Sequence, residues 1–441
     1  MPDAGQSVFI SYRRSVSSFI ARAVFMDLRA HDYDVFMDVE TIDAGEFRTV
    51  ILNQIAARAH FLLILTPGTL DRVNEPGDWL RTEIEHALSL QRNIVPLLVN
   101  NFDFKDTEPF LTGELSRLSG INALEVPHSY FDAAMERMRT RFLRQQTYGE
   151  IVPTPPAERA EVERKINEAA SRPAPTEQQL EAAERLNRGL ALQSSGDYDG
   201  AFAAYTDALR LNPQFAEGYC YRGTARHERR EFTAAIADFT QAMRLNPNFA
   251  EAYYHRGAAL RDDGKLDEAI IDFTAALHIS PYYAEAYLSR GNAYVDKGDY
   301  DAAIANYYQA LRFNPGYAEA YYSRANVYAE KGDPDAAIVD YSEALRLNPQ
   351  LVEAYYNRAI ARSDQGDYKG AIEDYSEALR LNPRFSHAYY NRGIARKAKG
   401  DLKGAISDYQ TYLDLGGGRR YGDQAEVEQI LRGLKGMVER S

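Results

Sequence analysis

The chain has 441 residues, which exceeds what one ordinary hydrophobic core fills, so two or more domains are expected. Its single cysteine excludes an intramolecular disulfide framework and a multi-cysteine metal site. The sequence shows no long apolar run and no leader-like start, and its net charge of −13 disfavours general nucleic-acid binding. Together these features predict a cytoplasmic protein with no membrane span and no nucleic-acid partner.

Short apolar runs alternate with amphipathic segments in residues 1–146. Strands are predicted at residues 7–11, 34–38, 60–65, 93–99 and 123–126, and helices at residues 18–30, 46–58, 78–90 and 131–144. This alternation indicates a parallel sheet with helices on both faces, and ligands of such sheets bind at the carboxyl ends of the strands. No Gly-x-Gly-x-x-Gly follows any of these strands, so the sequence lacks a Rossmann fingerprint.

Proline-rich punctuation follows this segment. Pro153-Thr154-Pro155-Pro156 and Pro173-Ala174-Pro175 bracket a charged helical stretch, residues 158–170. This composition predicts a semi-rigid linker over residues 147–181 that lets the flanking domains move relative to each other.

A period of 34 residues governs residues 182–419, where 26 of the 31 tyrosines lie. Asn-Pro recurs at this spacing, with Ser280-Pro281 filling the one gap. One column holds alanine in all seven units, an aromatic residue follows four positions later, and another column is glycine or alanine. The apolar rhythm within a unit predicts two helices and a proline stop. The seven units are residues 182–215, 216–249, 250–283, 284–317, 318–351, 352–385 and 386–419.

Paired helices with these small, aromatic and proline columns resemble the tetratricopeptide repeat (TPR). The resemblance implies an α-solenoid with a capping helix in residues 420–441. The repeat sequence departs from the family pattern in one column that is usually apolar. Here that column holds Arg222, Arg256, Arg290, Arg324, Arg358 and Arg392.

In the TPR family the second and fifth residues of each unit face a concave groove. The resemblance therefore implies groove positions at Tyr254, Tyr322, Tyr356, Tyr390, Glu251, Glu285, Glu319 and Glu353. Such a groove suits a protein or peptide that bears basic or aromatic groups. The glutamates have an alternative explanation, because a helix dipole favours acids in the first turn. The alternative for the tyrosines is core packing.

Three separated motifs in the first segment resemble those of the Toll/interleukin-1 receptor (TIR) domain. They are Val8-Phe9-Ile10-Ser11-Tyr12-Arg13-Arg14, Asp38 with the loop Ile42-Asp43-Ala44-Gly45-Glu46, and Trp79-Leu80-Arg81-Thr82-Glu83. The resemblance spans roughly residues 5–145 and implies a five-stranded, flavodoxin-like parallel sheet followed by the TPR solenoid. The sequence most resembles the bacterial branch of the family, in which TIR domains are often fused to repeat modules.

Some TIR domains cleave NAD+ between nicotinamide and ribose, and others only bind further TIR domains. By resemblance Glu83 is the catalytic carboxylate, which stabilises an oxocarbenium-like state, and Trp79 lies one helical turn earlier. Family enzymes often have cysteine directly after this tryptophan, where Leu80 stands here. The alternative for Glu83 is a solvated helix carboxylate, a role that suits Glu85 better.

By resemblance the residues that contact substrate are Ser11, Tyr12, Arg13, Phe36, Asp38 and Trp79. Arg13 would contact a phosphate group of the substrate. Trp79 would stack on an aromatic ring of the dinucleotide, and its alternative role is a hydrophobic staple at the start of the helix. Phe36 has core packing as its alternative. The loop through which TIR domains contact one another contains Asp43, Ala44, Gly45 and Glu46, the last of which has helix capping as its alternative. No metal or cofactor is expected, because NAD+ is the substrate.

The preferred interpretation is a NAD+ hydrolase, with an ADP-ribosyl cyclase as a variant of the same chemistry. A partner in the groove would trigger association of TIR domains into a homo-oligomer or filament, in bacterial anti-phage or stress immunity. The alternative is a non-enzymatic TIR–TPR adaptor. Nucleotide sensing without turnover is the third interpretation.

Overall fold

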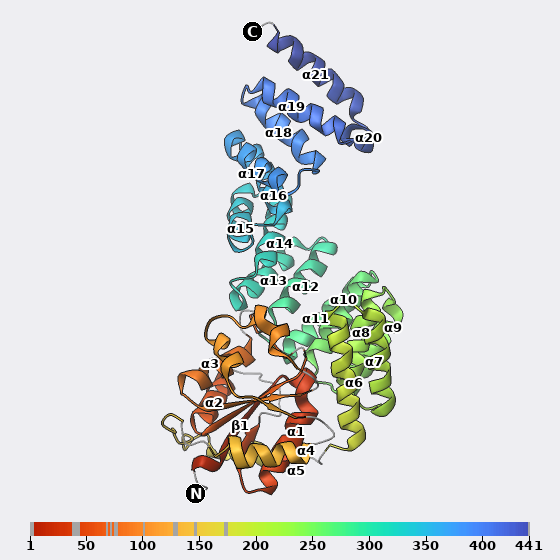
Figure 1. Ribbon diagram of the computed structural model, residues 1–441. Coiled ribbons are helices and arrows are strands. Elements are labelled where there is room, and N and C mark those ends of the chain that lie inside the picture. Colours follow the sequence, from red (N-terminus) through yellow and green to blue (C-terminus); the bar gives the residue numbers. More distant parts are fainter. Residues whose placement is uncertain are drawn as a thin grey trace. The chain divides into compact units, whose positions relative to one another are not determined.

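The computed structural model describes residues 4–37, 45–67, 69–70, 73–74, 78–99, 102–126, 131–144, 148–171 and 175–439 (Figure 1). The chain divides into two units, Met1–Tyr282 and Tyr283–Ser441. The first unit holds a sheet domain, the linker helix α5 (Arg159–Ser171) and three helix pairs, and the second unit holds four helix pairs and a C-terminal helical segment. Among the described residues, no helix combines the length and apolar character that crossing a membrane requires.

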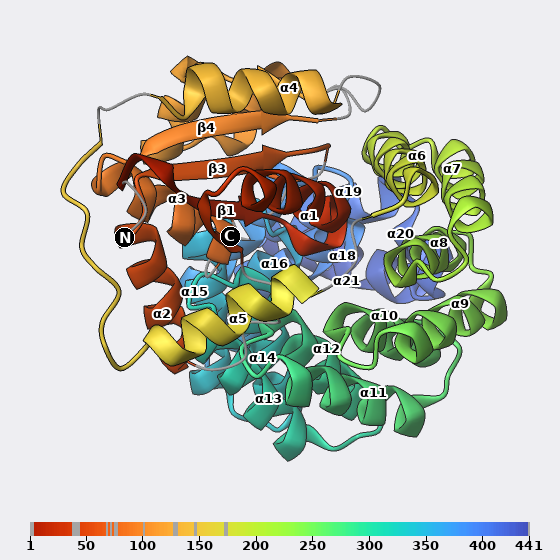
Figure 2. The same ribbon diagram turned by 90° about the horizontal axis from the view of Figure 1, so that it is seen from below.

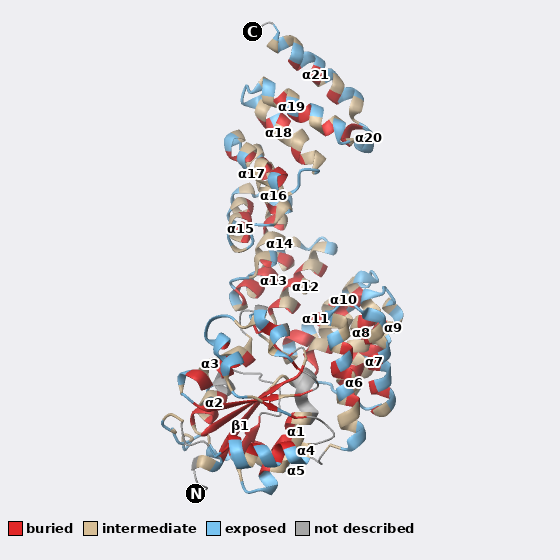
Figure 3. Cartoon of the chain, in the orientation of Figure 1, coloured by how far each residue is buried: buried red, intermediate tan, exposed pale blue. Residues whose placement is uncertain are grey.

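The sheet domain is built on five parallel strands in the order β2-β1-β3-β4-β5. The strands are β1 (Ser7–Tyr12), β2 (Asp34–Met37), β3 (His60–Leu65), β4 (Asn93–Leu98) and β5 (Leu124–Glu125). Val8 of β1 pairs with Val35 on one side and with His60 on the other. All residues of β3 are buried (Figure 3), as expected for a strand that helices cover on both faces. The predicted five-stranded parallel sheet is confirmed.

Helices cover both faces of the sheet (Figure 2), and the alternation of side chains along β1 divides the interior into two cores. The helices are α1 (Arg14–Ala30), α2 (Gly45–Ala56), α3 (Trp79–Ser89) and α4 (Phe131–Arg137), the last continuing as a π-helix over Met138–Phe142. The first core contains Val8 and Ile10 of β1 with residues of α1 and α4. The second core contains Phe9 with residues of α2 and α3. Three 3-10 helices that the sequence pattern did not predict are Ala4–Gln6, Phe104–Phe110 and Gly113–Gly120.

The linker helix α5 packs onto the edge strand β2 of the sheet domain. Val162 is buried in the second core and Ala169 in the first core, so one helix joins both cores across the sheet edge. Near its ends, Asn53 Nδ2 donates to Glu158 Oε1 at 2.7 Å and Arg22 Nη1 donates to the Ala169 carbonyl oxygen at 2.7 Å. The helix forms close to its predicted place. Its packing onto the sheet domain is an addition to the predicted semi-rigid linker, and the movement of the flanking domains stays a prediction.

Seven helix pairs follow within residues 175–439, and their bounds repeat with the period of the sequence. In the first unit they are α6 (Glu177–Ser194) with α7 (Tyr198–Leu211), α8 (Ala216–Glu228) with α9 (Phe232–Leu245), and α10 (Ala250–Asp262) with α11 (Leu266–Ile279). In the second unit they are α12 (Ala284–Asp296) with α13 (Tyr300–Phe313), α14 (Ala318–Glu330) with α15 (Pro334–Leu347), α16 (Val352–Asp364) with α17 (Tyr368–Leu381), and α18 (Ser386–Ala398) with α19 (Leu402–Asp414). Helices α20 (Gly417–Tyr421) and α21 (Gln424–Val438) complete the second unit. The predicted run of paired helices is confirmed.

The small and aromatic columns of the repeat meet inside each pair. A Cβ atom added to Gly223 would lie 2.7 Å from Cε1 of Phe239, and one added to Gly291 would lie 2.6 Å from Cε1 of Tyr307. Both rings are buried, so only a small residue fits opposite them without a shift. The turn inside a pair requires a left-handed residue, which is glycine in six turns and Arg230, with φ of 61°, in the seventh.

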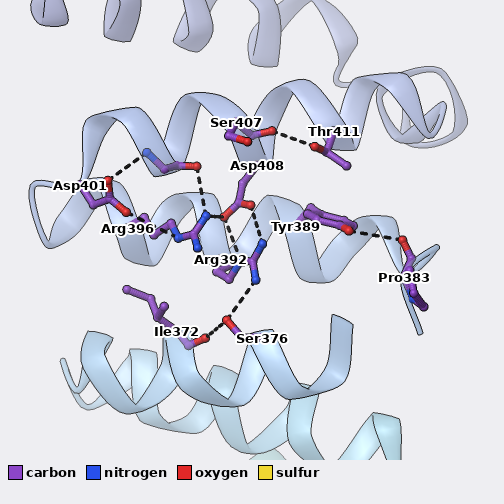
Figure 4. Close-up of polar contacts among 11 residues, drawn as sticks. Ile372, Ser376, Pro383, Tyr389, Arg392, Arg396, Asp401, Ser407, Asp408 and Thr411 are labelled. Atoms are coloured by element: carbon purple, nitrogen blue, oxygen red, sulfur yellow. Dashed lines mark hydrogen bonds and ion pairs between the residues drawn. The ribbon is translucent and has the colours of Figure 1, made fainter. Parts of the chain in front are cut away.

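The arginine column is paired with an acidic column that lies in the second helix of the same pair. Arg392 donates from Nε and Nη2 to the two carboxylate oxygens of Asp408, which is 2% exposed (Figure 4). The same two-bond arrangement joins Arg222 to Asp238, Arg256 to Asp272, Arg324 to Asp340 and Arg358 to Asp374. In the fourth pair Asn306 replaces the aspartate and accepts from Nε of Arg290. These bonds explain why arginine is tolerated in a column that is usually apolar.

Candidate active site

The carboxyl end of β1 lies where the strand order of the sheet changes direction. The chain passes from β1 to β2 on one side, and then places β3, β4 and β5 on the other side. The crevice at such a point is where parallel α/β sheets bind ligands. Ser11 is the last residue but one of β1 and pairs in register with Leu63 of β3, which places it at this crevice.

Glu83 of α3 is buried and hydrogen-bonded to Ser11. Oγ of Ser11 donates to Oε2 of Glu83 at 2.5 Å, and the two residues are 2% and 6% exposed. Burying a carboxylate is costly unless polar partners compensate it, so Glu83 does not fit the alternative of a solvated surface residue. Glu85 does fit it, since its side chain is 40% exposed and pairs with Arg81 at 2.8 Å. The structure therefore brings two predicted site residues together from the first strand and the third helix.

Arg13 ties the end of β1 to the start of α3. Its Nε donates to the carbonyl oxygen of Thr69 at 2.6 Å, and its Nη2 contacts Oδ2 of Asp78 at 2.8 Å. The other oxygen of Asp78 accepts from the backbone N–H of Arg81 at 3.0 Å and so caps α3. Asp78 is not among the predicted site residues, although an aspartate directly before a helix is a recognised capping signal. A contact of Arg13 with phosphate stays a prediction.

Two predicted substrate contacts are half-buried aromatic residues. Trp79 opens α3 one turn before Glu83, and its side chain packs against the second core. Tyr12 packs against the first core at the end of β1. Packing is thus part of the role of each residue, and the stacking of Trp79 on a substrate ring stays a prediction.

Phe36 lies in the second core and not at the surface of the crevice. Its side chain is 0% exposed, its ring lies 5.7 Å from that of Phe9, and Cζ of Arg58 lies 5.2 Å from its centroid. An enclosed ring has no surface to offer a nucleotide. The structure therefore supports the core-packing alternative for Phe36 rather than a substrate contact.

Several predicted residues fall where the structure gives no side-chain description. Asp38, Asp43 and Ala44 lie outside the described residues. Gly45 and Glu46 open α2, but their side chains are outside the description as well. The expected substrate contact of Asp38 and the expected assembly loop stay predictions.

The tyrosines predicted for the groove are half-buried and packed against aromatic residues of the second helices. The ring of Tyr322 lies 6.1 Å from that of Tyr341, and the ring of Tyr356 lies 5.8 Å from that of Tyr375. Nδ2 of Asn391 donates to the hydroxyl of Tyr356 at 2.9 Å. Tyr254 and Tyr390 are packed in the same manner against Phe273 and Tyr409. Each ring therefore takes part in helix packing and is only partly available to a ligand.

The glutamates predicted for the groove lie in the first turn of their helices, where the helix dipole favours them. Glu319 and Glu353 are exposed, whereas Glu251 and Glu285 are half-buried. The preceding member of this column, Glu217, is half-buried too, and burial together with the nearby charge of Glu251 raises its pKa to about 7. The acids of this column thus differ in their surroundings along the array.

Family comparisons agree with both halves of the chain. Residues 8–138 match the family model of the TIR domain. Tetratricopeptide repeat models match residues 186–242, 222–284, 318–351 and 352–385, and a TPR repeat model matches residues 291–332. The chain therefore carries a TIR domain followed by TPR repeats.

Curated relatives match the TIR domain alone. NAD(+) hydrolase tir-1 of Caenorhabditis elegans is 36% identical over 139 residues, which are 31% of this chain and 14% of that protein. NAD(+) hydrolase sarm1 of Drosophila melanogaster is 36% identical over 140 residues, 31% of this chain and 10% of that protein. NAD(+) hydrolase SARM1 of Danio rerio is 33% identical over 142 residues, 32% of this chain and 20% of that protein. The chain thus spans a fifth or less of the length of these relatives.

Solved structures match the repeats. YrrB, described as a TPR protein with an unusual peptide-binding site, is 23% identical with a TM-score of 0.39, over 44% of this chain and 97% of that chain. MamA is 29% identical with a TM-score of 0.34, over 37% of this chain and 96% of that chain.

Proposed function

We propose that the TIR domain hydrolyses NAD+ at the bond between nicotinamide and ribose, with Glu83 as the catalytic carboxylate. The observation that carries the proposal is the buried hydrogen bond of 2.5 Å between Ser11 and Glu83 at the carboxyl end of β1. A carboxylate held in a dry crevice stabilises positive charge far more than one in water. The TIR-domain relatives named NAD(+) hydrolases support the assignment.

The chemistry requires little more than one such carboxylate. When the glycosidic bond breaks, its electron pair goes to the ring nitrogen, and nicotinamide leaves as a neutral molecule that needs no general acid. The ribose is left as an oxocarbenium ion, whose positive charge the Glu83 carboxylate stabilises. Water then attacks the ribose carbon, loses one proton to solvent and gives ADP-ribose. Alternatively, a nitrogen of the adenine donates its electron pair to that carbon and gives a cyclic isomer, with the positive charge transferred to the adenine ring.

Ser11 and Arg13 act on the position of Glu83 in this proposal. The Ser11 hydroxyl holds one carboxylate oxygen and so fixes the orientation of the carboxylate in the crevice. Arg13 fixes the first turn of α3 through Asp78 and so sets where Glu83 stands relative to β1. A carboxylate that is already oriented pays no reorganisation cost during the reaction.

In the same proposal the repeat array controls the reaction. A protein or peptide partner binds the TPR groove, and TIR domains then associate into a homo-oligomer or filament that completes the site across neighbours. Signal-driven loss of NAD+ in the cytoplasm would suit bacterial anti-phage or stress immunity. The fusion of a TIR domain to repeats supports this arrangement, because TPR arrays serve protein binding.

The test is nicotinamide release from NAD+ by the purified full-length protein, with and without induced clustering through a dimerising tag. Release that Glu83→Gln abolishes and Glu85→Gln leaves intact supports the proposal. Absence of release under every clustering condition, or full release by Glu83→Gln, would refute it in favour of the adaptor. Chromatography of the second product separates ADP-ribose from its cyclic isomer.

A further inference from the structure

A cavity of about 820 Å³ lies in the second unit, between the first helices of the fourth, fifth and sixth pairs. It is lined by residues of α12, α14 and α16, with contributions from the second helices α13 and α15. Its volume is in the range of ligand sites in proteins. The tyrosines that were predicted for the groove do not line it. The chemistry of the cavity therefore comes from other residues.

Two asparagines present oriented amide groups to this cavity. The hydroxyl of Tyr307 donates to Oδ1 of Asn292 at 2.7 Å, and the hydroxyl of Tyr341 donates to Oδ1 of Asn326 at 2.7 Å. Nδ2 of Asn357 donates to the same oxygen of Asn326 at 3.1 Å. Because the amide oxygens are engaged, the NH2 groups of Asn292 and Asn326 are the parts left for a ligand. An amide NH2 group donates to carbonyl oxygens, which an extended peptide offers in succession.

Two carboxylates also line the cavity. Glu330 and Asp364 are the last residues of α14 and α16, and both are exposed. An acid at the C-terminal end of a helix opposes the helix dipole, so helix stability does not explain this placement. In contrast, the helix dipole does explain the glutamates in the first turns of the same helices. The same end position is acidic in five successive first helices, at Glu228, Asp262, Asp296, Glu330 and Asp364.

The cavity is negatively charged as a whole. None of its lining residues is lysine, arginine or histidine. Two arginines of the same helices are neutralised elsewhere, since Arg324 is paired with Asp340 and Arg358 with Asp374. Arg290 of α12 does not line the cavity and bonds to the neutral amide of Asn306. The half-buried ring of Tyr300 gives the wall an aromatic surface, and the face of such a ring attracts cations. Tyr307 and Tyr341 also line the cavity but are each only 1% exposed.

We propose that this cavity binds the lysine or arginine side chain of an extended segment of a protein partner. Glu330 and Asp364 pair with the cationic group, the ring of Tyr300 packs along its aliphatic stem, and Asn292 and Asn326 hold main-chain carbonyl oxygens on either side of it. This assignment rests on the groove function proposed above and names the class of ligand: a basic segment, not an acidic one.

The experiment measures binding of fluorescein-labelled nonapeptide pools to the full-length protein by fluorescence anisotropy. The central residue of each pool is fixed as arginine, lysine, leucine or glutamate, and the flanking positions are random. We expect the arginine and lysine pools to bind about tenfold more tightly than the leucine pool, and the glutamate pool more weakly still. The double variant E330Q/D364N should lose this preference.

The matched control is the double variant E343Q/E377Q, which removes the same number of negative charges from the neighbouring helices α15 and α17 but lies outside the cavity lining and outside the predicted groove positions. It should keep the preference within about twofold. Equal loss in both double variants would mean that general charge attracts the peptide, and the assignment would fall. The assignment would also fall if the four pools bound with equal affinity. It would fall too if spermidine, at the same concentration of positive charge, displaced the arginine pool, because the site would then bind any polycation.

Nicotinamide release by the same preparations keeps this result separate from the proposed function. If the protein selects basic peptides but releases no nicotinamide, the peptide assignment stands and the hydrolase proposal falls. A protein that releases nicotinamide but selects no peptide loses the assignment alone.

Discussion

Oγ of Ser11 lies 2.5 Å from Oε2 of Glu83, although 72 residues separate them in the chain. One residue comes from the end of β1 and the other from the helix that follows β3. Both side chains are enclosed, so little water competes for this hydrogen bond. It gives the hydrolase proposal its sharpest tests.

Glu83→Gln should lower nicotinamide release by about 100-fold or more, because the neutral amide cannot stabilise the oxocarbenium charge. Ser11→Ala should lower it by about tenfold, since the carboxylate remains but loses its fixed orientation. Initial rates with NAD+ measure both effects, and thermal unfolding checks that the variants fold.

The two effects should not add. In the double variant Ser11→Ala/Glu83→Gln the rate should equal that of Glu83→Gln alone, because Ser11 acts through the carboxylate that is gone. A further tenfold loss in the double variant would mean that Ser11 contacts the substrate independently.

Asp78 combines two roles that different substitutions separate. Asp78→Asn keeps an oxygen that caps α3 but loses the ion pair with Arg13, and Asp78→Ala loses both. We expect the alanine variant to cost about 1 kcal/mol more than the asparagine variant, which is the usual value of a cap. Urea denaturation followed at the single tryptophan, Trp79, reports on this helix directly. Equal costs would show that the ion pair alone matters.

Arg290 offers a test of the arginine–aspartate pairs. Burial lowers its pKa, whereas the carboxylates of Asp272 and Asp340 help to raise the pKa of Arg256 and Arg324. Asn306→Asp should restore the missing carboxylate and stabilise the second unit by about 1 kcal/mol. Asp340→Asn in the next pair is the mirror control and should destabilise. A lower unfolding temperature for Asn306→Asp would contradict this account.

Glu217 should make the array less stable as pH rises. Its pKa in the folded protein is about 7, above the ordinary value near 4.5, so folding favours the protonated form. The benefit is complete below about pH 4.5 and is lost as pH rises through 7. Glu217→Gln should flatten the fall in unfolding temperature between pH 5 and pH 8, measured by circular dichroism. The exposed Glu353→Gln should leave that fall unchanged.

Ala169 and Ala170 of α5 form a matched pair for testing how the linker helix packs. Ala169 is 0% exposed in the first core, and the adjacent Ala170 is exposed. Ala169→Glu should detach the C-terminal part of α5 and speed amide hydrogen exchange in β2, and Ala170→Glu should leave exchange unchanged. Slow exchange in both variants would mean that α5 does not protect the strand.

The features that follow from local pattern were predictable from the sequence. Apolar runs such as His60–Leu65 located the strands, and the period of the repeat located the paired helices and the small residues opposite Phe239 and Tyr307. The position of Glu83 followed from its spacing to Trp79 and from the family resemblance.

The features that depend on tertiary neighbours were not predictable in this way. The partner of each column arginine lies sixteen residues away in another helix, so no helical spacing reveals it. Phe36 lies near the carboxyl end of a strand, as a ligand contact would, and only the packing of Phe9 and Arg58 shows that it is enclosed. The charged composition of α5 masks the two apolar residues, Val162 and Ala169, that fasten it to the sheet.

The column arginines also reach backwards along the array. Arg392 donates to the hydroxyl of Ser376 in the preceding pair at 3.0 Å (Figure 4), and Arg358 and Arg256 reach Ser342 and Thr240 in the same way. Between the fourth and fifth pairs this place holds Tyr308, which is 60% exposed, instead of serine or threonine. The coupling between neighbouring helix pairs therefore varies along the array, and local unfolding of the array should begin at Tyr308.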